Sequence, residues 1–448
     1  MSTTDEHQLP TIELQSRDQH SNEHGDLHEA ASQGQELKPV DRGRDAWIVL
    51  IATFVIEALF WGFPMCFGIF QNYYSDLPEF KNDRANIPII GTLAQGLYSV
   101  GAPFSAALTK RFPKHQRQQI WAGWPLCIIG LLAASFVNSV NGLIVTQGVL
   151  YGIGFVTLSY PTISMVNEWW VARKGMAFGL ISAASGATGA AMPFILESLL
   201  AKYGHRITLR ASAVAMFILT APLLPLFRGR LPPSETATLA RIDWAFFKRP
   251  LFWVYACSIF VQGLGFYFPV VFLPSYATSV GMPTIKGALL SALMSIAQVL
   301  GQFFFGFLSD KNLSVSFLAI ACCIVAAAAS FGLWGPAKSM PLLVVFSLIY
   351  GFFGFAFGTM RVAMGLAVTK DPSNVFATFP IFVFLQGIGN ILVGPISAAL
   401  VSGKASPGRF GAGLYESTII FTGSSSILAA LIIGLWHGYQ PLKALLKP

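Results

Sequence analysis

Long apolar segments alternate with short polar segments from residue 41 almost to the end of the chain. Six apolar segments precede a polar stretch at 228–249, and six follow it. A helix of about 20 apolar residues is long enough to cross the roughly 30 Å hydrocarbon core of a bilayer. The pattern therefore predicts twelve transmembrane helices in two groups of six, near 47–74, 87–108, 118–137, 142–167, 175–200, 207–227, 250–279, 284–309, 314–334, 341–369, 374–402 and 415–437.

The polar segments divide the predicted helices into domains. Residues 1–40 have few large apolar side chains and are predicted to be a disordered tail. The first six helices form a predicted N-terminal bundle at 41–227, and a loop at 228–249 joins it to a C-terminal bundle at 250–440. A short tail follows at 441–448. The predicted fold class is an all-α membrane protein with twelve transmembrane helices in two six-helix pseudo-repeats.

Composition agrees with a membrane protein. The 448 residues are 54% hydrophobic and 11% charged, whereas soluble domains carry about 25% charged residues. The net charge of +8 is spread over short loops, so nothing indicates a nucleic-acid partner. The five cysteines lie in apolar runs without the spacing of metal ligands. No metal or other cofactor is expected, and the lipid bilayer is the expected environment.

The charges of the loops predict the orientation. An even number of helices places both termini on one side of the membrane. The segments on that side carry eighteen Lys and Arg residues, and the loops on the other side carry nine. Because cytoplasmic loops are enriched in Lys and Arg, both termini are predicted to be cytoplasmic, and the plasma membrane is the expected location.

The two groups of helices share a weak internal repeat. GFPMCFGIF surrounds Pro64 in the first helix, and GLGFYFPVVFLP surrounds Pro269 in the seventh, some 205 residues later. Proline removes one backbone hydrogen bond and bends a helix. Repeated halves with Gly- and Pro-interrupted helices at matching positions are typical of secondary transporters.

Four segments carry a resemblance to a known family. GFLSDK at 306–311 matches the G-x-L-[AS]-D-[RK] loop motif of the major facilitator superfamily. RPLFWVYACSIFVQGLGFYFPVVFLPSYA at 249–277 and EWWVARKGMAFGLISAASGATGAAMP at 168–193 are similar to its monocarboxylate-porter family, especially the fungal-type members. DRGRDAW at 41–47 is a degenerate version of that family's D-G-G-x-G-W signature. The resemblance covers roughly 41–440 and implies a fold in which helices 1, 4, 7 and 10 line a central cavity.

The sequence departs from the proton-coupled lactate carriers of this family. Those carriers have a lysine after the Phe-Pro of helix 1, where this chain has Met65. They also have an aspartate and an arginine in helix 8, where this chain has Gln298 and Gln302. The coupling mechanism of the lactate carriers is therefore not implied, and proton-coupled monocarboxylate uptake is kept only as an alternative function.

Two charged residues lie inside helices that the resemblance places around the cavity. Glu57 is ten residues past Trp47, about 15 Å deep, and Arg361 lies about 14 Å deep from the same face. A lone charge at such a depth costs at least about 2.5 kcal/mol, so it normally faces a cavity or a partner. One hypothesis is that Arg361 binds an acidic group of the substrate and Glu57 acts as its counter-charge or as a proton carrier. The alternative is that each charge caps nearby backbone or reaches toward the cytoplasm.

Aromatic and amide side chains extend the predicted cavity. Glu57 and Trp61 fall on one stripe of the first helix, and Met65 flanks it. Amides bind polar, uncharged groups, although they also join helices to one another. The predicted substrate-binding residues are Glu57, Trp61, Met65, Tyr160, Gln262, Tyr267, Gln298, Gln302, Arg361 and Gln386. Such a cavity suits a larger, partly apolar organic molecule better than lactate.

The resemblance also implies gating residues at the loops. Asp310 and Lys311 follow helix 8 and are expected to hold one conformation through helix-end and interdomain hydrogen bonds. The same role is expected for Arg111, Glu168 and Arg173. The alternative is that these residues are solvated loop charges.

These features together predict a secondary active transporter of a small organic molecule that works by alternating access. The expected substrate is an organic acid or a partly hydrophobic secondary metabolite, and both import and efflux remain open. A coupling proton is considered, and a monomer is expected to be the functional unit. A transporter-like nutrient sensor is the alternative from another class, although the tail and central loop are short for one. No nucleophile elbow, metal cluster or phosphate loop indicates an enzyme.

Overall fold

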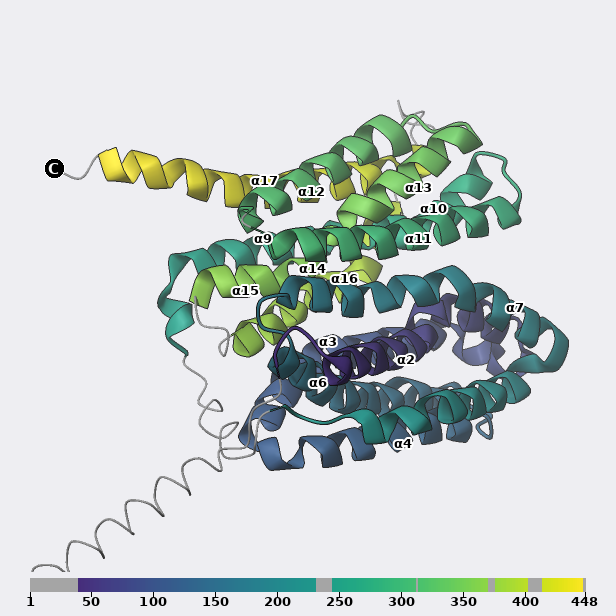
Figure 1. The fold of residues 1–448 in the computed structure, drawn as a ribbon. Helices are drawn as coiled ribbons and strands as arrows, with labels where there is room; N and C mark the ends of the chain where they lie inside the picture. Colours follow the sequence, from purple (N-terminus) through teal and green to yellow (C-terminus); the bar gives the residue numbers. More distant parts are fainter. Residues whose placement is uncertain (1–38, 231–243, 312, 370–374, 402–412, 446–448) are drawn as a thin grey trace, which may run out of the picture. The chain divides into compact units, whose positions relative to one another are not determined.

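A computed structural model describes residues 39–230, 244–311, 313–369, 375–401 and 413–445 (Figure 1). The predicted disordered tail lies outside these residues except for its last two positions. Most of the predicted central loop and the last three residues of the chain also lie outside them. Residues 40–448 form one compact unit.

The first half of the chain is a set of packed helices, drawn in purple to teal in Figure 1. Its elements are α2 (Arg44–Asp76), η1 (Pro78–Asn86), α3 (Ile87–Arg111), η2 (Pro113–His115), α4 (Gln116–Ala134), α5 (Val140–Leu143), the π-helical turn η3 (Ile144–Leu150), α6 (Tyr151–Trp169), α7 (Lys174–Thr220) and η4 (Ala221–Leu226). Within this half, α2 packs on α7, and α6 packs on both α3 and α4.

The second half repeats this arrangement, in green to yellow. Its elements are η5 (Trp244–Lys248), α9 (Pro250–Phe266), α10 (Phe268–Ser279), α11 (Thr284–Ser309), α12 (Val315–Ala329), the π-helical turn η6 (Ser330–Trp334), α13 (Met340–Gly354), α14 (Ala356–Thr359), α15 (Arg361–Thr369), α16 (Val375–Val401), η7 (Gly413–Tyr415) and α17 (Glu416–Leu445). Here α11 packs on α13, and α9 packs on both α16 and α17.

The helices account for the twelve predicted membrane crossings. In the described part of the chain, eight helical segments are long and apolar enough to cross a membrane. One of them, Lys174–Leu226, makes two crossings, because Gly204 interrupts it with a φ of 75° and a ψ of 172°. Only a residue without a Cβ adopts this left-handed backbone easily. With α3, α4 and α16 as three further crossings, the predicted all-α, twelve-helix fold is confirmed.

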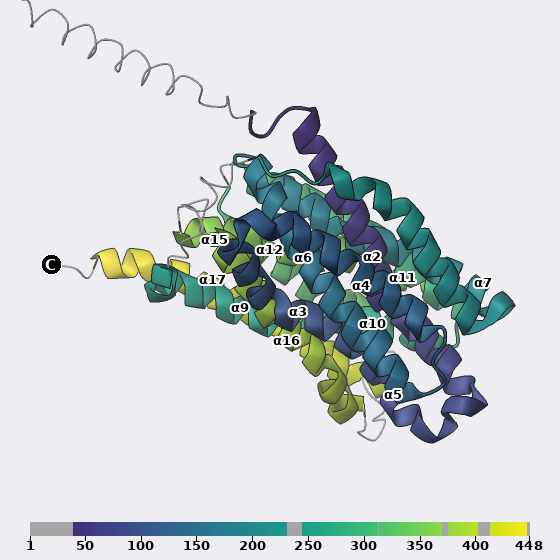
Figure 2. The same cartoon turned by 90° about the horizontal axis from the view of Figure 1, so that it is seen from below.

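Two helix pairs join the halves to each other. We call the contact of α7 with α11 the α7–α11 seam, and the contact of α3 with α16 the α3–α16 seam. Figure 2 shows α3 beside α16. The two seams flank the space between the halves, and the side chains that could meet a substrate lie in that space.

The two prolines of the internal repeat have different effects. The chain is interrupted at Tyr267, between α9 and α10, two residues before Pro269. By contrast, α2 is one continuous helix through Pro64. A second interruption divides the tenth crossing at Phe355 and again at Met360, directly before Arg361. Interrupted helices are tolerated at membrane depth only where the freed backbone faces protein or a cavity.

Candidate functional site

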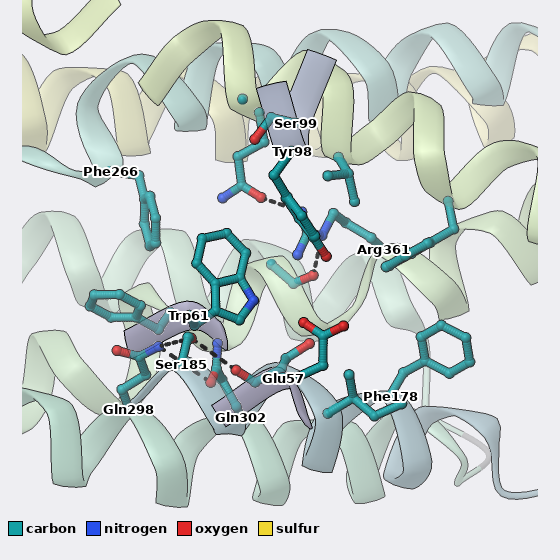
Figure 3. Close-up of a pocket in the computed structure, with 18 of the residues that line it drawn as sticks. Glu57, Trp61, Tyr98, Ser99, Phe178, Ser185, Phe266, Gln298, Gln302 and Arg361 are labelled. Atoms are coloured by element: carbon teal, nitrogen blue, oxygen red, sulfur yellow. Dashed lines mark hydrogen bonds between the residues drawn. The ribbon is translucent and has the colours of Figure 1, made fainter. Parts of the chain in front are cut away.

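A central cavity of about 140 Å³ lies between the two halves (Figure 3). Both halves contribute to its wall, with α2, α3, α6 and α7 on one side and helices from α9 to α16 on the other. Eight of the ten predicted substrate-binding residues line it: Glu57, Trp61, Met65, Tyr267, Gln298, Gln302, Arg361 and Gln386. The structure thus brings together side chains that are separated by up to 329 positions in the sequence.

Arg361 provides a positive charge in this wall. It is the first residue of α15, where the helix interruption at Met360 turns its side chain toward α16. Its Nη1 donates a hydrogen bond of 2.6 Å to Oε1 of Gln386, and its Nε donates one of 2.5 Å to the carbonyl of Gly358. The guanidinium also lies 5.7 Å from the ring centre of Phe379. Arg361 therefore caps a nearby backbone carbonyl, as the predicted alternative had it, and also lines the cavity.

Glu57 provides a negative charge on the opposite half. It lies on α2 and is only 1% exposed, and its Oε1 has no hydrogen-bond partner among the described residues. The hydroxyl oxygens of Ser159 and Tyr160 on α6 are likewise buried and without a partner in that part of the chain. Figure 3 shows the Glu57 carboxylate directed into the space that Arg361 also faces. The two residues, both described, form no ion pair with each other.

An amide pair occupies the wall on α11. Nε2 of Gln298 donates to Oγ of Ser185 on α7 at 3.1 Å and to Oε1 of Gln302 at 3.4 Å. Both glutamines are buried yet line the cavity. Gln298 therefore joins the halves, which is one of the two predicted roles of the amides. Both amides line the cavity, and their role in substrate binding stays a prediction.

Tyr160 and Gln262 do not line the cavity, contrary to the predicted site. Tyr160 lies behind the wall, with its ring 6.0 Å from that of Tyr98, and Gln262 donates to the carbonyl of Gly354 at 3.5 Å inside the second half. The sequence reasoning also missed Tyr98 and Ser99, which α3 contributes to the wall. Both lie on the second crossing, from which the sequence reasoning assigned no residue to the cavity.

A second, larger cavity adjoins the central one. This apolar cavity, as we call it, has a volume of about 560 Å³ and shares Met65, Ser185, Tyr267, Gln298 and Phe355 with the wall of the central cavity. The Tyr267 hydroxyl donates to Sδ of Met65 at 3.5 Å, so one contact between the halves spans the boundary of the two cavities. The residue that replaces the lysine of the lactate carriers is thus a boundary residue.

Asp310 joins the halves at the end of the α7–α11 seam. Its carboxylate accepts backbone hydrogen bonds from Gly175 at 2.6 Å and Met176 at 2.7 Å, in the first turn of α7. The unpaired amides and the positive end of the helix dipole favour an anion there. Burial raises the pKa of the Asp310 carboxyl, and the two hydrogen bonds act in the opposite direction.

Asp41 binds the loop directly before that helix end. Its carboxylate accepts hydrogen bonds of 2.9 Å from the backbone of Val171, Ala172 and Arg173, and its own N–H donates to the carbonyl of Trp169. Two carboxylates therefore bind five backbone N–H groups around the start of α7. The sequence indicated Asp41 only as part of a degenerate signature.

The other predicted gating residues have less direct positions. Lys311 lies 4.7 Å from the ring centre of Phe307 on its own helix, and Arg173 contributes its backbone N–H to Asp41. Oε2 of Glu168 accepts a hydrogen bond of 3.0 Å from the backbone of Arg230, within the first half. Arg111 is exposed in the last turn of α3. Within the described residues, the side chain of Asp310 bridges the halves through its bonds to the α7 amides.

Comparisons with known proteins give one consistent family. Residues 49–372 match the family model described as Major Facilitator Superfamily. The chain is 25% identical to the MFS transporter asaE of Aspergillus flavus over 88% of this chain and 89% of the relative. It is 24% identical to the fujikurins efflux protein of Gibberella fujikuroi, over 90% of this chain and 86% of that protein.

Two further similarities agree with the resemblance found in the sequence. The chain is 24% identical to monocarboxylate transporter 12 of Xenopus laevis, over 87% of this chain and 88% of that protein. Its fold is similar to that of the proton:xylose symporter XylE bound to 6-bromo-6-deoxy-D-glucose, with a TM-score of 0.64, 12% identity, and coverage of 87% and 95% of the two chains.

Proposed function

We propose that this chain, which belongs to the major facilitator superfamily, exports an organic acid or a partly hydrophobic secondary metabolite across the plasma membrane. The proposal proceeds from what the family establishes: the chain is a multi-pass membrane protein and a secondary transporter of small organic molecules. The observation that carries the proposal is Arg361, a cation at the wall of a cavity in which half of the other lining residues are aromatic or amide side chains. A guanidinium in such surroundings favours a carboxylate or another planar acid group.

The proposed cycle moves the bundles 41–227 and 250–440 relative to each other around this cavity. With both termini in the cytoplasm, Asp310 and the start of α7 lie at the cytoplasmic end of the α7–α11 seam. Breaking the hydrogen bonds between Asp310 and the α7 amides would open the cavity to the cytoplasm, and forming them again would close it. Lys311, Arg111, Glu168 and Arg173 are proposed to adjust this closure from the surrounding loops.

Coupling to a proton is proposed to involve Glu57. Its buried carboxylate has an oxygen without a hydrogen-bond partner in the described residues and shares the cavity with Arg361. A carboxyl that exchanges a proton there would change the net charge of the cavity between binding and release. We propose that a single chain carries out this cycle as a monomer.

The departure from lactate carriers now has a location. Met65, Gln298 and Gln302, which stand where those carriers have charged coupling residues, all line the central cavity. The difference therefore lies in the wall of the cavity that we propose as the binding site, which supports a substrate other than lactate. The named efflux function of the Gibberella fujikuroi relative supports export.

Transport by variants of Arg361 tests the proposal. The full-length protein would be reconstituted in liposomes and assayed for flux of a panel of aromatic and aliphatic monocarboxylic acids. Arg361→Gln is expected to lower flux by about 100-fold, because charge-assisted hydrogen bonds contribute about 1.5–3 kcal/mol each. Arg361→Lys should retain part of the flux, and Arg210→Gln, which removes a guanidinium far from the cavity wall, should leave it unchanged. Normal flux in Arg361→Gln at normal expression would contradict the proposal.

A further inference from the structure

The two cavities differ in size. The central cavity, of about 140 Å³, is close to the size of a cavity that holds one benzene ring, about 150 Å³. The apolar cavity is about 560 Å³. A molecule whose acid group lies at Arg361 therefore has room for little else in the central cavity, and a larger body would extend past Met65 and Tyr267.

The contact between Tyr267 and Met65 at the boundary of the cavities can be displaced. Tyr267 lies at the interruption between α9 and α10 rather than inside a helix. Its hydroxyl is held across the boundary by the thioether of Met65, a weak acceptor on a flexible side chain. Both side chains are half-buried, and each lines both cavities at the edge of a core cluster. A bound chain could thus displace this contact at small cost, without unfolding a helix.

The two cavities differ in the signs of the charges in their walls. The central cavity contains both Arg361 and Glu57. Among the described residues that line the apolar cavity, Asp76 and Glu197 carry the only charges, and both are exposed. Most of the remaining wall is apolar, with side chains such as Ile69, Phe194 and Leu200. A second anionic group on the substrate would meet these two carboxylates.

We propose that the two cavities form one bipartite site for an amphipathic monoacid, with the acid group at Arg361 and the apolar body in the apolar cavity beyond Met65 and Tyr267. The site discriminates against diacids because Asp76 and Glu197 repel a distal carboxylate. This inference rests on the proposed function and specifies its substrate class.

Competition between defined acids tests the proposal. Radiolabelled decanoate would be bound to the purified full-length protein, with Arg361→Gln as the background for partition into detergent. Unlabelled decanoate should compete at least about tenfold better than butyrate, because each additional buried methylene favours binding. Decanol, which lacks the charge, and decanedioate, which has a second charge, should each compete at least about tenfold more weakly than decanoate.

Three variants separate the parts of the site. The double variant Asp76→Asn, Glu197→Gln should bring decanedioate to within about threefold of decanoate. Tyr267→Trp, which narrows the boundary, should weaken decanoate but not butyrate. Tyr267→Phe, which removes the hydroxyl that contacts Met65 and Gln95, should bind decanoate as well as the parent protein does or better.

The outcomes distinguish this inference from the proposed function. If no acid binds above the Arg361→Gln background, the proposed organic-acid function is wrong. If butyrate and decanoate bind equally, or if decanedioate competes like decanoate in the parent protein, acid binding stands and the bipartite site is wrong. A diacid discrimination that persists in the double variant would overturn the role of Asp76 and Glu197.

Discussion

The α7–α11 seam and the α3–α16 seam join the same two halves, yet different forces hold them. At the end of the α7–α11 seam, the Asp310 carboxylate accepts two backbone hydrogen bonds from the other half. At the matching end of the α3–α16 seam, the Thr109 hydroxyl lies 2.8 Å from the Ser105 carbonyl and 3.0 Å from Oε1 of Gln119, both within its own half. Among the described residues, the α3–α16 seam has no carboxylate that corresponds to Asp310.

The α3–α16 seam relies on shape instead. Gly387 lies so close to α3 that a Cβ there would be 2.1 Å from Cβ of Ser99, and a Cβ on Gly96 would be 3.1 Å from Ile391. Van der Waals contacts of this kind stabilise the seam only while the two helices stay close, and they are not directional as hydrogen bonds are. We infer that opening at the cytoplasmic end begins at the α7–α11 seam, where two specific bonds break, while the α3–α16 seam adjusts by sliding.

Removal of the Asp310 carboxylate should have the largest effect. Asp310→Ala loses two charge-assisted hydrogen bonds, which together correspond to about a 100-fold shift toward the form open to the cytoplasm. The shift would be measured as labelling of Ser182→Cys, in the central cavity, by an impermeant thiol reagent applied from the cytoplasmic side. The exposed Cys257 would be replaced by serine in all samples. Unchanged labelling would show that Asp310 does not hold the seam closed.

Removal of the Asp41 carboxylate should give a smaller shift in the same direction. Asp41→Ala frees three backbone N–H groups of the loop that leads into α7, and these groups are exposed enough for water to replace part of each bond. We expect about a tenfold rise in labelling, because these bonds lie within the first half and act on the seam only by positioning the α7 amides that Asp310 binds. Asp83→Ala, at an exposed position of η1, is the control. Equal labelling in the two variants would contradict a specific role for Asp41.

A methyl group at Gly387 should disturb the seam that relies on shape. Gly387→Ala forces apart α3 and α16 and should lower flux by about tenfold, because overpacking costs about 1–3 kcal/mol. Ser99→Gly removes the atom that the methyl would meet, so the double variant should recover most of the loss. A double variant no better than Gly387→Ala would mean that the contact with Ser99 is not the cause.

Thr109→Val should have the smallest effect on gating. It removes hydrogen bonds that lie inside the first half and should cost about 1 kcal/mol of folding stability. Labelling of Ser182→Cys should stay at the parent level. A rise in labelling comparable to that of Asp310→Ala would mean that Thr109 also holds the closed form, and the two seams would then not differ in this respect.

The helices could be predicted because their signal is local. Apolar length alone predicted twelve crossings, and helix rise alone placed Glu57 and Arg361 at a similar depth, where both do line one cavity. Which face of a helix turns inward is decided by packing, which no local pattern contains. For this reason Tyr160 and Gln262 were assigned to the cavity although both lie behind it.

Contacts between distant segments were the other limit. The interdomain motif indicated Asp310, but the amides that it binds lie 134 and 135 positions away. The amides that Asp41 binds lie 130 to 132 positions away, and Asp41 itself has a positive φ of 57° that no side-chain pattern predicts. The assignments of substrate-binding and gating residues stay predictions until flux is measured.

The hydrogen bond between Arg361 and Gln386 sets a limit on how tightly any acid can be held. The guanidinium already has a neutral amide oxygen at 2.6 Å and a carbonyl at 2.5 Å in the structure. An arriving carboxylate gains only the difference between its own oxygens and these resident acceptors, not the full strength of an ion pair. Moderate affinity of this kind shortens the time that a molecule stays bound. On the proposed function, this hydrogen bond thus favours rapid turnover over accumulation of a trapped complex.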